Sequence, residues 1–280
     1  MRDQTVLDEV RSFHAKLMAV ASGSDDQRLE RVFELVPREA FLGHGPWKVV
    51  VNRRYVETPS ANPIHVYHNG LVALDEAKRI NNGEPYLHAA WIGAAAPASG
   101  EVVVHVGAGT GYYSAILSML VLPKGRVQAY EIEESLAHRA ASNLDPFEAV
   151  GVVHGDATAM ELPDCDLIYV NAGVVSPPGS WLRALRPSGR IIFPWSPSNS
   201  VSLTLLMTRS ENGFAVRILG PSWFIPCVGA SDSAGCTKVP NPLQARSITK
   251  AWLTADRPPD ETAVAVCRDV WFSGSPYKSL

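Results

Sequence analysis

Hydrophobic residues near the start of the chain recur at the spacing of an amphipathic helix. We therefore predict a helix over residues 6–21, with apolar positions at Val6, Leu7, Val10, Phe13, Leu17 and Val20. Further helices are expected over residues 27–36, ending at Pro37, and over residues 71–80 and 86–96. Residues 41–63 contain several glycines and prolines without sustained periodicity, so we expect a structured loop there.

From residue 101 the pattern changes to short β-branched runs that alternate with apolar helical segments. Strands are predicted over residues 102–106, 127–130, 152–154, 167–170 and 190–194, and helices over residues 112–120, 134–144 and 180–185. Residues 201–208 and 214–219 are predicted to form a hairpin, because Asn212 and Gly213 favour a tight turn. The alternation predicts an α/β fold with a doubly wound parallel sheet that ends in an antiparallel pair.

After Pro226 the chain is rich in Gly, Ser and Pro, and it ends in a strand-like run over residues 262–272. We therefore expect three parts. Residues 1–100 form an N-terminal helical and loop region, residues 101–230 form the α/β core, and residues 231–280 form a C-terminal extension.

Composition narrows the class of partners. The 25 Lys and Arg against 28 Asp and Glu give a net charge of −3, without the basic excess that nucleic-acid binding needs. Apolar runs are shorter than the roughly 18 residues that cross a bilayer, and no secretory signal is visible, so we expect a cytoplasmic protein without a membrane partner. The four cysteines lack C-x-x-C spacing and the histidines lack H-E-x-x-H spacing, which predicts free thiols and no metal site.

A glycine-rich turn joins the strand at residues 102–106 to the helix that follows. Gly107, Gly109 and Gly111 are spaced so that a ligand could approach backbone N–H groups directly. Glu131 follows about twenty residues later at a strand end, where its carboxylate could accept hydrogen bonds from both hydroxyls of a ribose. A tight structural bend is the alternative, and the strand–turn–helix context favours ligand binding.

Two further polar segments follow the third and fourth strands of this region. Asp156, beside Ala157, could meet the amino edge of an adenine, or it could cap a short helix. Asn171 ends the next strand. Because ligands of open parallel sheets bind beyond the carboxyl ends of the strands, we expect these segments and the glycine turn to face one crevice.

These residues resemble the motifs of class I S-adenosylmethionine-dependent methyltransferases. The resemblance rests on residues 105–112, Glu131, Gly155 with Asp156, and residues 166–170. Within that superfamily, the chain is similar to the protein-L-isoaspartate O-methyltransferases over most of residues 27–230. The residues that carry this similarity are residues 35–38, Pro85, His88, Leu185, and residues 189–194, 217–219 and 224–226.

The resemblance implies a Rossmann-like fold with a mostly parallel seven-stranded sheet, and residues 1–100 are then expected to cap the active site. The implied cofactor is S-adenosyl-L-methionine, and the implied acceptor is a protein, a peptide or a small molecule. The implied cofactor-binding residues are His105, Gly107, Ala108, Gly109, Thr110, Gly111, Tyr112, Glu131, Ile132, Asp156, Ala157 and Asn171.

Two positions depart from the family pattern. His105 stands where the family has an acidic residue, and Gly83 aligns with the family's active-site serine. Asn82 could supply replacement hydrogen-bond donors, and His88 could contact the methionine portion or act as a base, so we assign Asn82, Gly83 and His88 to the catalytic side. An ordinary helix-breaking turn and a core histidine are the alternatives for these residues.

Three functions remain open at this point. The leading one is O-methylation of a carboxylate, such as that of an isoaspartyl residue, which is already ionised at neutral pH and needs no base. The others are methylation of a small-molecule hydroxyl or amine, and a pseudoenzyme that holds the cofactor without transfer. Arg38, Arg53 and Arg54 are interpreted as solvated surface charges, with binding of a substrate carboxylate as the alternative.

Overall fold

The computed structural model describes residues 2–274, so Met1 and residues 275–280 of the predicted terminal parts lie outside the described residues. Contacts divide the chain into two units. Unit 1 contains the residues up to Glu101 together with Ala108–His154, and unit 2 contains Val102–Gly107 and the residues from Gly155 onward. The three-part division expected from composition stays a prediction.

Unit 1 begins with helices that pack on one another. Helix α1 contacts both α2 and α3, and Arg28 of α2 donates to backbone carbonyls of Pro97 and Leu120 at 2.9 and 2.8 Å. The helices of the unit are α1 (Arg2–Ala21), α2 (Arg28–Leu35), α3 (Pro85–Ala95), α4 (Tyr112–Val121) and α5 (Glu134–Leu144), with short 3-10 turns η1 (Arg38–Phe41) and η2 (Pro63–Val66). The predicted helices over residues 6–21, 27–36, 86–96, 112–120 and 134–144 are confirmed.

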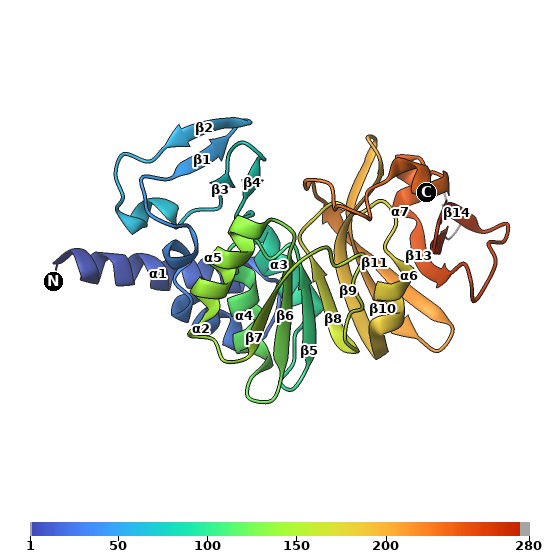
Figure 1. Cartoon of the computed structure of the whole chain (residues 1–280), viewed down its shortest axis with the longest axis horizontal. Coiled ribbons are helices and arrows are strands. Elements are labelled where there is room, and N and C mark those ends of the chain that lie inside the picture. Colours follow the sequence, from blue (N-terminus) through green and yellow to red (C-terminus); the bar gives the residue numbers. More distant parts are fainter. Residues whose placement is uncertain (1, 275–280) are drawn as a thin grey trace. The chain divides into compact units, whose positions relative to one another are not determined.

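Unit 1 also contains a small antiparallel sheet with strand order β2-β1-β3-β4 (Figure 1). Its strands are β1 (Lys48–Val51), β2 (Arg54–Glu57), β3 (Leu71–Asp75) and β4 (Ile80–Asn81). The expected loop at residues 41–63 therefore contains a hairpin, and the helix predicted over residues 71–80 is wrong. The Asp75 side chain accepts the Lys78 N–H and closes a turn, so the segment folds back on itself and pairs with β1 instead of coiling.

A parallel strand pair completes unit 1. Strands β6 (Arg126–Glu131) and β7 (Val150–His154) lie side by side, and they place Glu131 opposite His154 at their carboxyl ends. Both strands cover the segments predicted from the sequence.

Unit 2 carries the mixed sheet. Strands β5 (Val102–Val106), β8 (Cys165–Val170) and β9 (Leu185–Ser198) run parallel, and helix α6 (Gly179–Ala184) lies between β8 and β9 in the chain. Strands β10 (Val201–Ser210) and β11 (Gly213–Pro221) then continue the sheet antiparallel. All five residues of β5 are buried, as a continuous β-branched run in a parallel sheet requires. The predicted α/β class, the parallel core and the antiparallel hairpin are confirmed.

The C-terminal extension continues this sheet instead of forming a loose tail. Strand β13 (Ile248–Leu253) pairs with β11 (Figure 1). Strands β15 (Val270–Gly274), β14 (Ala263–Cys267) and β12 (Cys236–Lys238) follow in that order. The single run predicted over residues 262–272 is in fact two strands with a reversal between Cys267 and Val270. Over the described residues, unit 2 alone has more strands than the seven predicted.

The cysteines differ partly from expectation. Cys236 and Cys267 form a disulfide between β12 and β14, across a sequence separation of 31 residues, so the prediction of free thiols is wrong for this pair. Cys165 and Cys227 are free and buried, as predicted. Spacing along the chain did not indicate the pair, because antiparallel register across the extension brings the two residues together.

Within residues 2–274, no helix combines the length and the apolar character that a bilayer-spanning segment needs.

Candidate functional site

The glycine turn that begins at the end of β5 has the backbone that its sequence predicts. Gly107, Gly109 and Gly111 have φ values of 75°, 58° and 95°, a region in which residues with side chains are strained. A Cβ atom on Gly109 would meet a single atom within 4 Å, the Leu74 Cδ1 atom at 3.3 Å. The outer surface of the turn at Gly109 therefore has room for a ligand to approach the backbone.

Three N–H groups of the turn already have partners in unit 1. The Ala108 N–H donates to the Tyr130 carbonyl at 3.0 Å, the Gly109 N–H to Glu131 Oε2 at 2.6 Å, and the Gly111 N–H to the Ala108 carbonyl at 2.9 Å. The sequence predicts N–H groups open to a ligand, whereas these three are engaged within the protein. A cofactor at this turn would thus be held through close backbone approach and the Glu131 carboxylate.

Glu131 lies at the carboxyl end of β6, where the sequence predicts it. Its Oε1 atom accepts the Glu133 N–H at 2.9 Å, and the side chain is buried. Burial raises the pKa of Glu131, and the hydrogen bonds from Glu133 and Gly109 oppose this shift. Each carboxylate oxygen keeps acceptor capacity beyond one N–H bond, so the group can still accept hydrogen bonds from ribose hydroxyls. The neighbouring Ile132 side chain is exposed, and its carbonyl lies 3.2 Å from His154 Nε2.

The side chains that follow the turn carry unused polar atoms. Among the described residues, Thr110 Oγ1 and the hydroxyls of Tyr112 and Tyr113 are buried without a hydrogen-bond partner. Burial raises the pKa of both tyrosines, so their hydroxyls stay protonated and available as donors. Unused donors beside an open glycine backbone fit a polar small-molecule ligand. Of these residues, Tyr113 is absent from the sequence prediction, and its position directly after the turn is the only signal for it.

The segment that precedes α3 is fixed by a buried arginine. The Arg38 guanidinium donates to the carbonyls of Val66, His68 and Gly70 at 2.6, 2.9 and 3.0 Å. It also donates to Asn82 Oδ1 and to the Gly83 carbonyl, both at 3.3 Å. Arg38 is thus neither a solvated surface charge nor a free binding group for a carboxylate, and it acts by positioning the Asn82–Gly83 turn.

Gly83 and His88 lie against each other in this turn. Gly83 has a φ of 78°, and a Cβ atom at this position would stand 2.4 Å from His88 Nε2. The His88 ring is buried and stacks on Tyr113 with 3.8 Å between ring centroids and 19° between planes. The structure therefore brings together Gly83 and His88 of the predicted catalytic group, beside Asn82, and adds Arg38 and Tyr113.

Unit 2 contributes a second predicted pair. His105 on β5 is buried, and its Nε2 atom lies 2.9 Å from Asn171 Nδ2 at the end of β8. Burial lowers the pKa of His105 to about 3, so the ring is neutral and its Nε2 atom accepts the amide hydrogen. Asn171 Oδ1 is buried without a partner, which leaves an acceptor for a ligand donor. A neutral imidazole and an amide thus replace the acidic residue expected at position 105.

The Asp156 side chain stabilises a turn over residues 157–159, so the alternative that it caps a short helix is wrong. Its Oδ1 atom accepts both the N–H and the hydroxyl of Thr158 at 2.8 Å. The Ala157 carbonyl accepts the Trp181 Nε1–H at 3.0 Å, and Ala157 is buried. These bonds give the segment after residue 154 a fixed conformation within unit 2.

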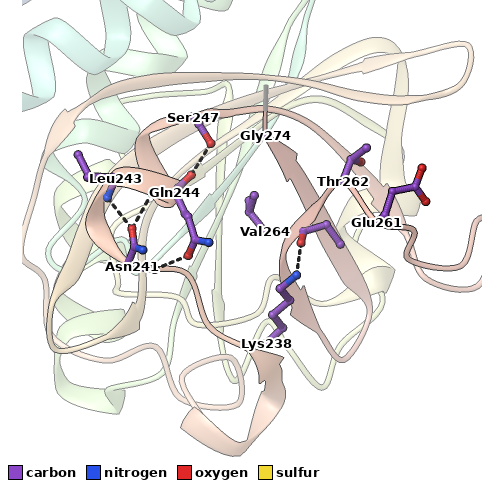
Figure 2. A pocket seen from close by; sticks show the side chains of 10 residues that line it. Lys238, Asn241, Leu243, Gln244, Ser247, Glu261, Thr262, Val264 and Gly274 are labelled. Atoms are coloured by element: carbon purple, nitrogen blue, oxygen red, sulfur yellow. Dashed lines mark hydrogen bonds between the residues drawn. The ribbon is translucent and has the colours of Figure 1, made fainter. Parts of the chain in front are cut away.

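A cavity of about 550 Å³ lies in the C-terminal extension. Figure 2 shows that its polar lining residues pair with one another: Asn241 Oδ1 accepts the N–H groups of Leu243 and Gln244, and Ser247 donates to the Gln244 carbonyl. Lys238 Nζ donates to the Ala263 carbonyl. These groups are engaged within the chain, so they do not select a ligand. Among residues 2–274, no group of three or more His, Cys, Asp or Glu side chains is arranged to hold a metal ion.

Comparison with known proteins finds matches to the sequence and to the fold. The sequence model of the family described as protein-L-isoaspartate(D-aspartate) O-methyltransferase matches residues 19–232. The chain is 32% identical to the protein-L-isoaspartate O-methyltransferase of Pelotomaculum thermopropionicum, over 59% of this chain and 72% of that protein. It is 29% identical to the protein of the same name in Methylorubrum populi, over 81% of this chain and 99% of that protein.

Solved structures share the fold at low sequence identity. A structure named protein-L-isoaspartate O-methyltransferase matches with a TM-score of 0.66 and 20% identity, over 94% of this chain and 88% of that chain. A Plasmodium falciparum protein in complex with S-adenosyl-L-homocysteine matches with a TM-score of 0.61 and 17% identity, over 78% of this chain and 97% of that chain.

Proposed function

We propose a reaction and its residues on the premise that the chain belongs to the protein-L-isoaspartate(D-aspartate) O-methyltransferase family, whose model covers residues 19–232. The chain is an S-adenosyl-L-methionine-dependent methyltransferase of this family. The acceptor we propose is the α-carboxylate of an isoaspartyl residue in a protein or peptide, which is free because the side-chain carboxyl of that residue forms the peptide bond. The family match carries this proposal, and the Gly109–Glu131 contact of 2.6 Å supports the cofactor half of it.

We assign the amino-acid end and the ribose of the cofactor to predicted residues of unit 1. In unit 1 the turn from Ala108 to Tyr112 would hold the amino-acid end, Glu131 would accept the ribose hydroxyls, and Ile132 would supply an apolar contact. In unit 2, His105, Gly107, Asp156, Ala157 and Asn171 stay predicted cofactor-binding residues. The unpartnered Thr110 Oγ1 atom and the open backbone at Gly109 support the assignment in unit 1, and the unpartnered Asn171 Oδ1 atom supports the prediction in unit 2.

The chain has to orient an acceptor and exclude water. When bound, S-adenosyl-L-methionine supplies a methyl group activated by a sulfonium. The free α-carboxylate of an isoaspartyl residue has a pKa of about 3.5 and is ionised at neutral pH, so no residue has to remove a proton from it. Asn82 and His88 would orient the carboxylate by hydrogen bonds, and Arg38 would hold the turn that carries Asn82.

The contact between Gly83 and His88 favours a second candidate. His88 fills the space in which a serine side chain would stand, so an imidazole replaces the hydroxyl of the family. An imidazole can accept a proton, which a hydroxyl or amine acceptor needs and a carboxylate does not. Methylation of a small-molecule hydroxyl or amine is therefore the second proposed function.

A methyl-transfer assay distinguishes these proposals. The purified chain would be incubated with tritiated methyl donor and either an isoaspartyl peptide, the same peptide with a normal aspartyl residue, or a small-molecule extract. Labelling of the isoaspartyl peptide alone supports the first proposal, and labelling confined to the extract supports the second. Calorimetric binding of the cofactor without labelling of any acceptor would overturn both and indicate a pseudoenzyme. A cytoplasmic location and the lack of nucleic-acid and membrane partners stay predictions.

A further inference from the structure

Helix α1 carries apolar side chains on two different faces. Leu7, Ala15 and Met18 are buried against unit 1, where α1 contacts α2 and α3. Arg11 also attaches this face of α1 to unit 1, because its guanidinium pairs with Glu39 and donates to the Tyr67 hydroxyl at 3.2 Å. This face therefore carries most of the packing of α1 on its own unit.

Those remaining residues form a second stripe, which we call the α1 stripe. Its members are separated alternately by four and three residues: Val6, Val10, Phe13, Leu17 and Val20. Three of them are strongly exposed, Val6 at 47%, Phe13 at 63% and Val20 at 81%, whereas Val10 and Leu17 are half-buried. Alternating spacings of four and three are those of a coiled-coil seam, and the stripe extends over about 21 Å of helix.

Scattered exposed apolar residues are ordinary, but a continuous stripe of them marks a contact surface. Four of the five stripe residues precede residue 19, where the family match begins. The α1 stripe therefore lies mostly outside the region to which the methyltransferase reaction is assigned.

The charges beside the stripe specify the partner. Glu9 and Lys16 are exposed on one flank, seven residues apart, whereas Leu7 and His14 on the other flank are buried in unit 1. If two copies of α1 meet antiparallel about Phe13, Val6 of each copy lies near Val20 of the other. Glu9 of each copy then lies opposite Lys16 of the other, and both ionic pairs are favourable.

A parallel pairing lacks this complementarity. It would place Glu9 of one helix against the flank of Leu7 and His14 on the other, where these two buried residues offer no exposed opposite charge. A twofold antiparallel contact presents the same patch from both copies, as closed dimers require. We propose that the α1 stripe is a dimer interface, on which α1 of a second copy of this chain packs antiparallel with Glu9–Lys16 pairs at both ends.

Sedimentation velocity on the full chain over a concentration series tests this interface. We expect a monomer–dimer equilibrium in the unmodified chain, and we expect Phe13→Glu to weaken dimerisation at least tenfold, because it places two like charges at the centre of the contact. Phe13 is exposed, so the variant should keep its thermal midpoint at concentrations where the chain is monomeric. A chain that stays monomeric at every concentration, or a dimer that Phe13→Glu leaves unchanged, overturns the proposal.

Charge reversal tests the antiparallel geometry itself. Glu9→Lys and Lys16→Glu should each remain monomeric alone, and an equimolar mixture of the two should form a heterodimer, because every ionic pair is then restored. Glu30→Lys, the same charge change at an exposed position on α2, is the matched control and should dimerise like the unmodified chain. Failure of the mixture to associate, with both variants monomeric, contradicts the antiparallel pairing.

Discussion

His88 Nε2 lies 2.4 Å from the position that a Cβ atom on Gly83 would occupy. A carbon and a nitrogen atom that are not bonded to each other do not approach so closely, so the imidazole in its present position and a side chain at residue 83 exclude each other. The family's serine therefore cannot be restored by one substitution, and the turn before α3 depends on glycine for space as well as for its φ of 78°.

We predict that Gly83→Ser lowers methyl transfer at least tenfold and destabilises the chain beyond the backbone cost of a positive φ. Gly100→Ser is the matched control, because Gly100 has a φ of 89° and no neighbouring atom within 4 Å of its Cβ position. This variant should lose only about 1–2 kcal/mol of stability, the cost of a side chain at a positive φ, and it should keep its activity.

Adding His88→Ala to Gly83→Ser should recover stability, since it removes the ring that the serine meets. Urea unfolding and the methyl-transfer assay on the four proteins measure both effects. Equal losses for Gly83→Ser and Gly100→Ser would contradict a steric role for His88.

Substitution of Gly109 should block cofactor binding. Valine at this position brings a branched side chain to a backbone with a φ of 58° and onto the surface that we assign to the cofactor. Isothermal titration with S-adenosyl-L-homocysteine should show at least a tenfold loss of affinity for Gly109→Val and little change for Gly100→Val. Unchanged binding by Gly109→Val would exclude the turn as the cofactor site.

Removal of the Glu131 carboxylate should weaken cofactor binding specifically. Glu131→Ala is expected to cost ~1–3 kcal/mol of binding free energy, the scale of charge-assisted hydrogen bonds. Glu133→Ala, which leaves the backbone N–H donor to Glu131 in place, is the neighbouring control. The same titration checks both variants, and equal affinities in the two would remove Glu131 from the ribose contact.

The buried His105 makes stability depend on pH. Its pKa is lowered to about 3 in the folded chain by burial, against an ordinary value of 6.5. Between these values the unfolded chain binds a proton that the folded chain does not, so the free energy of unfolding falls as the pH falls from 6.5 toward 3. His105 alone contributes a slope of up to about 1.4 kcal/mol per pH unit.

Urea midpoints at pH 7.5 and pH 5 measure this slope. His105→Gln should show a smaller loss of stability between the two pH values than the unmodified chain. His138→Gln, at an exposed position on α5, should show the full loss. If both variants lost the same stability on acidification, His105 would not be the group that titrates.

The disulfide should stabilise the C-terminal extension. Cys236–Cys267 closes a segment of 31 residues, and removal of such a link typically costs about 2–4 kcal/mol. Thiol titration under denaturing conditions should find two free thiols before reduction, Cys165 and Cys227, and four afterwards. Cys267→Ala should increase hydrogen exchange in β12 and β14 more than Cys165→Ala does, and four thiols before reduction would exclude the bond.

Much of the α/β core follows from local pattern. The β-branched run at residues 102–106, the glycines after it and the apolar helices at 112–120 and 134–144 each carry their own signal within a few residues, and the structure places elements there. Glu131 is likewise predictable, because the end of a strand that follows the glycine turn is a defined position in this fold.

Other features depend on contacts between residues that are distant in the chain. Residues 71–80 contain enough helix formers to predict a helix, but pairing of β3 with β1 makes them strands. An arginine is usually a surface charge, so the sequence predicts Arg38 to be exposed. In the structure, carbonyl groups of residues 66–70 and 82–83 surround its guanidinium and accept its hydrogen bonds. The Cys236–Cys267 bond depends in the same way on register across β12 and β14. Hydrophobic periodicity predicts which face of a segment is buried, but it does not identify the distant segment that packs against that face.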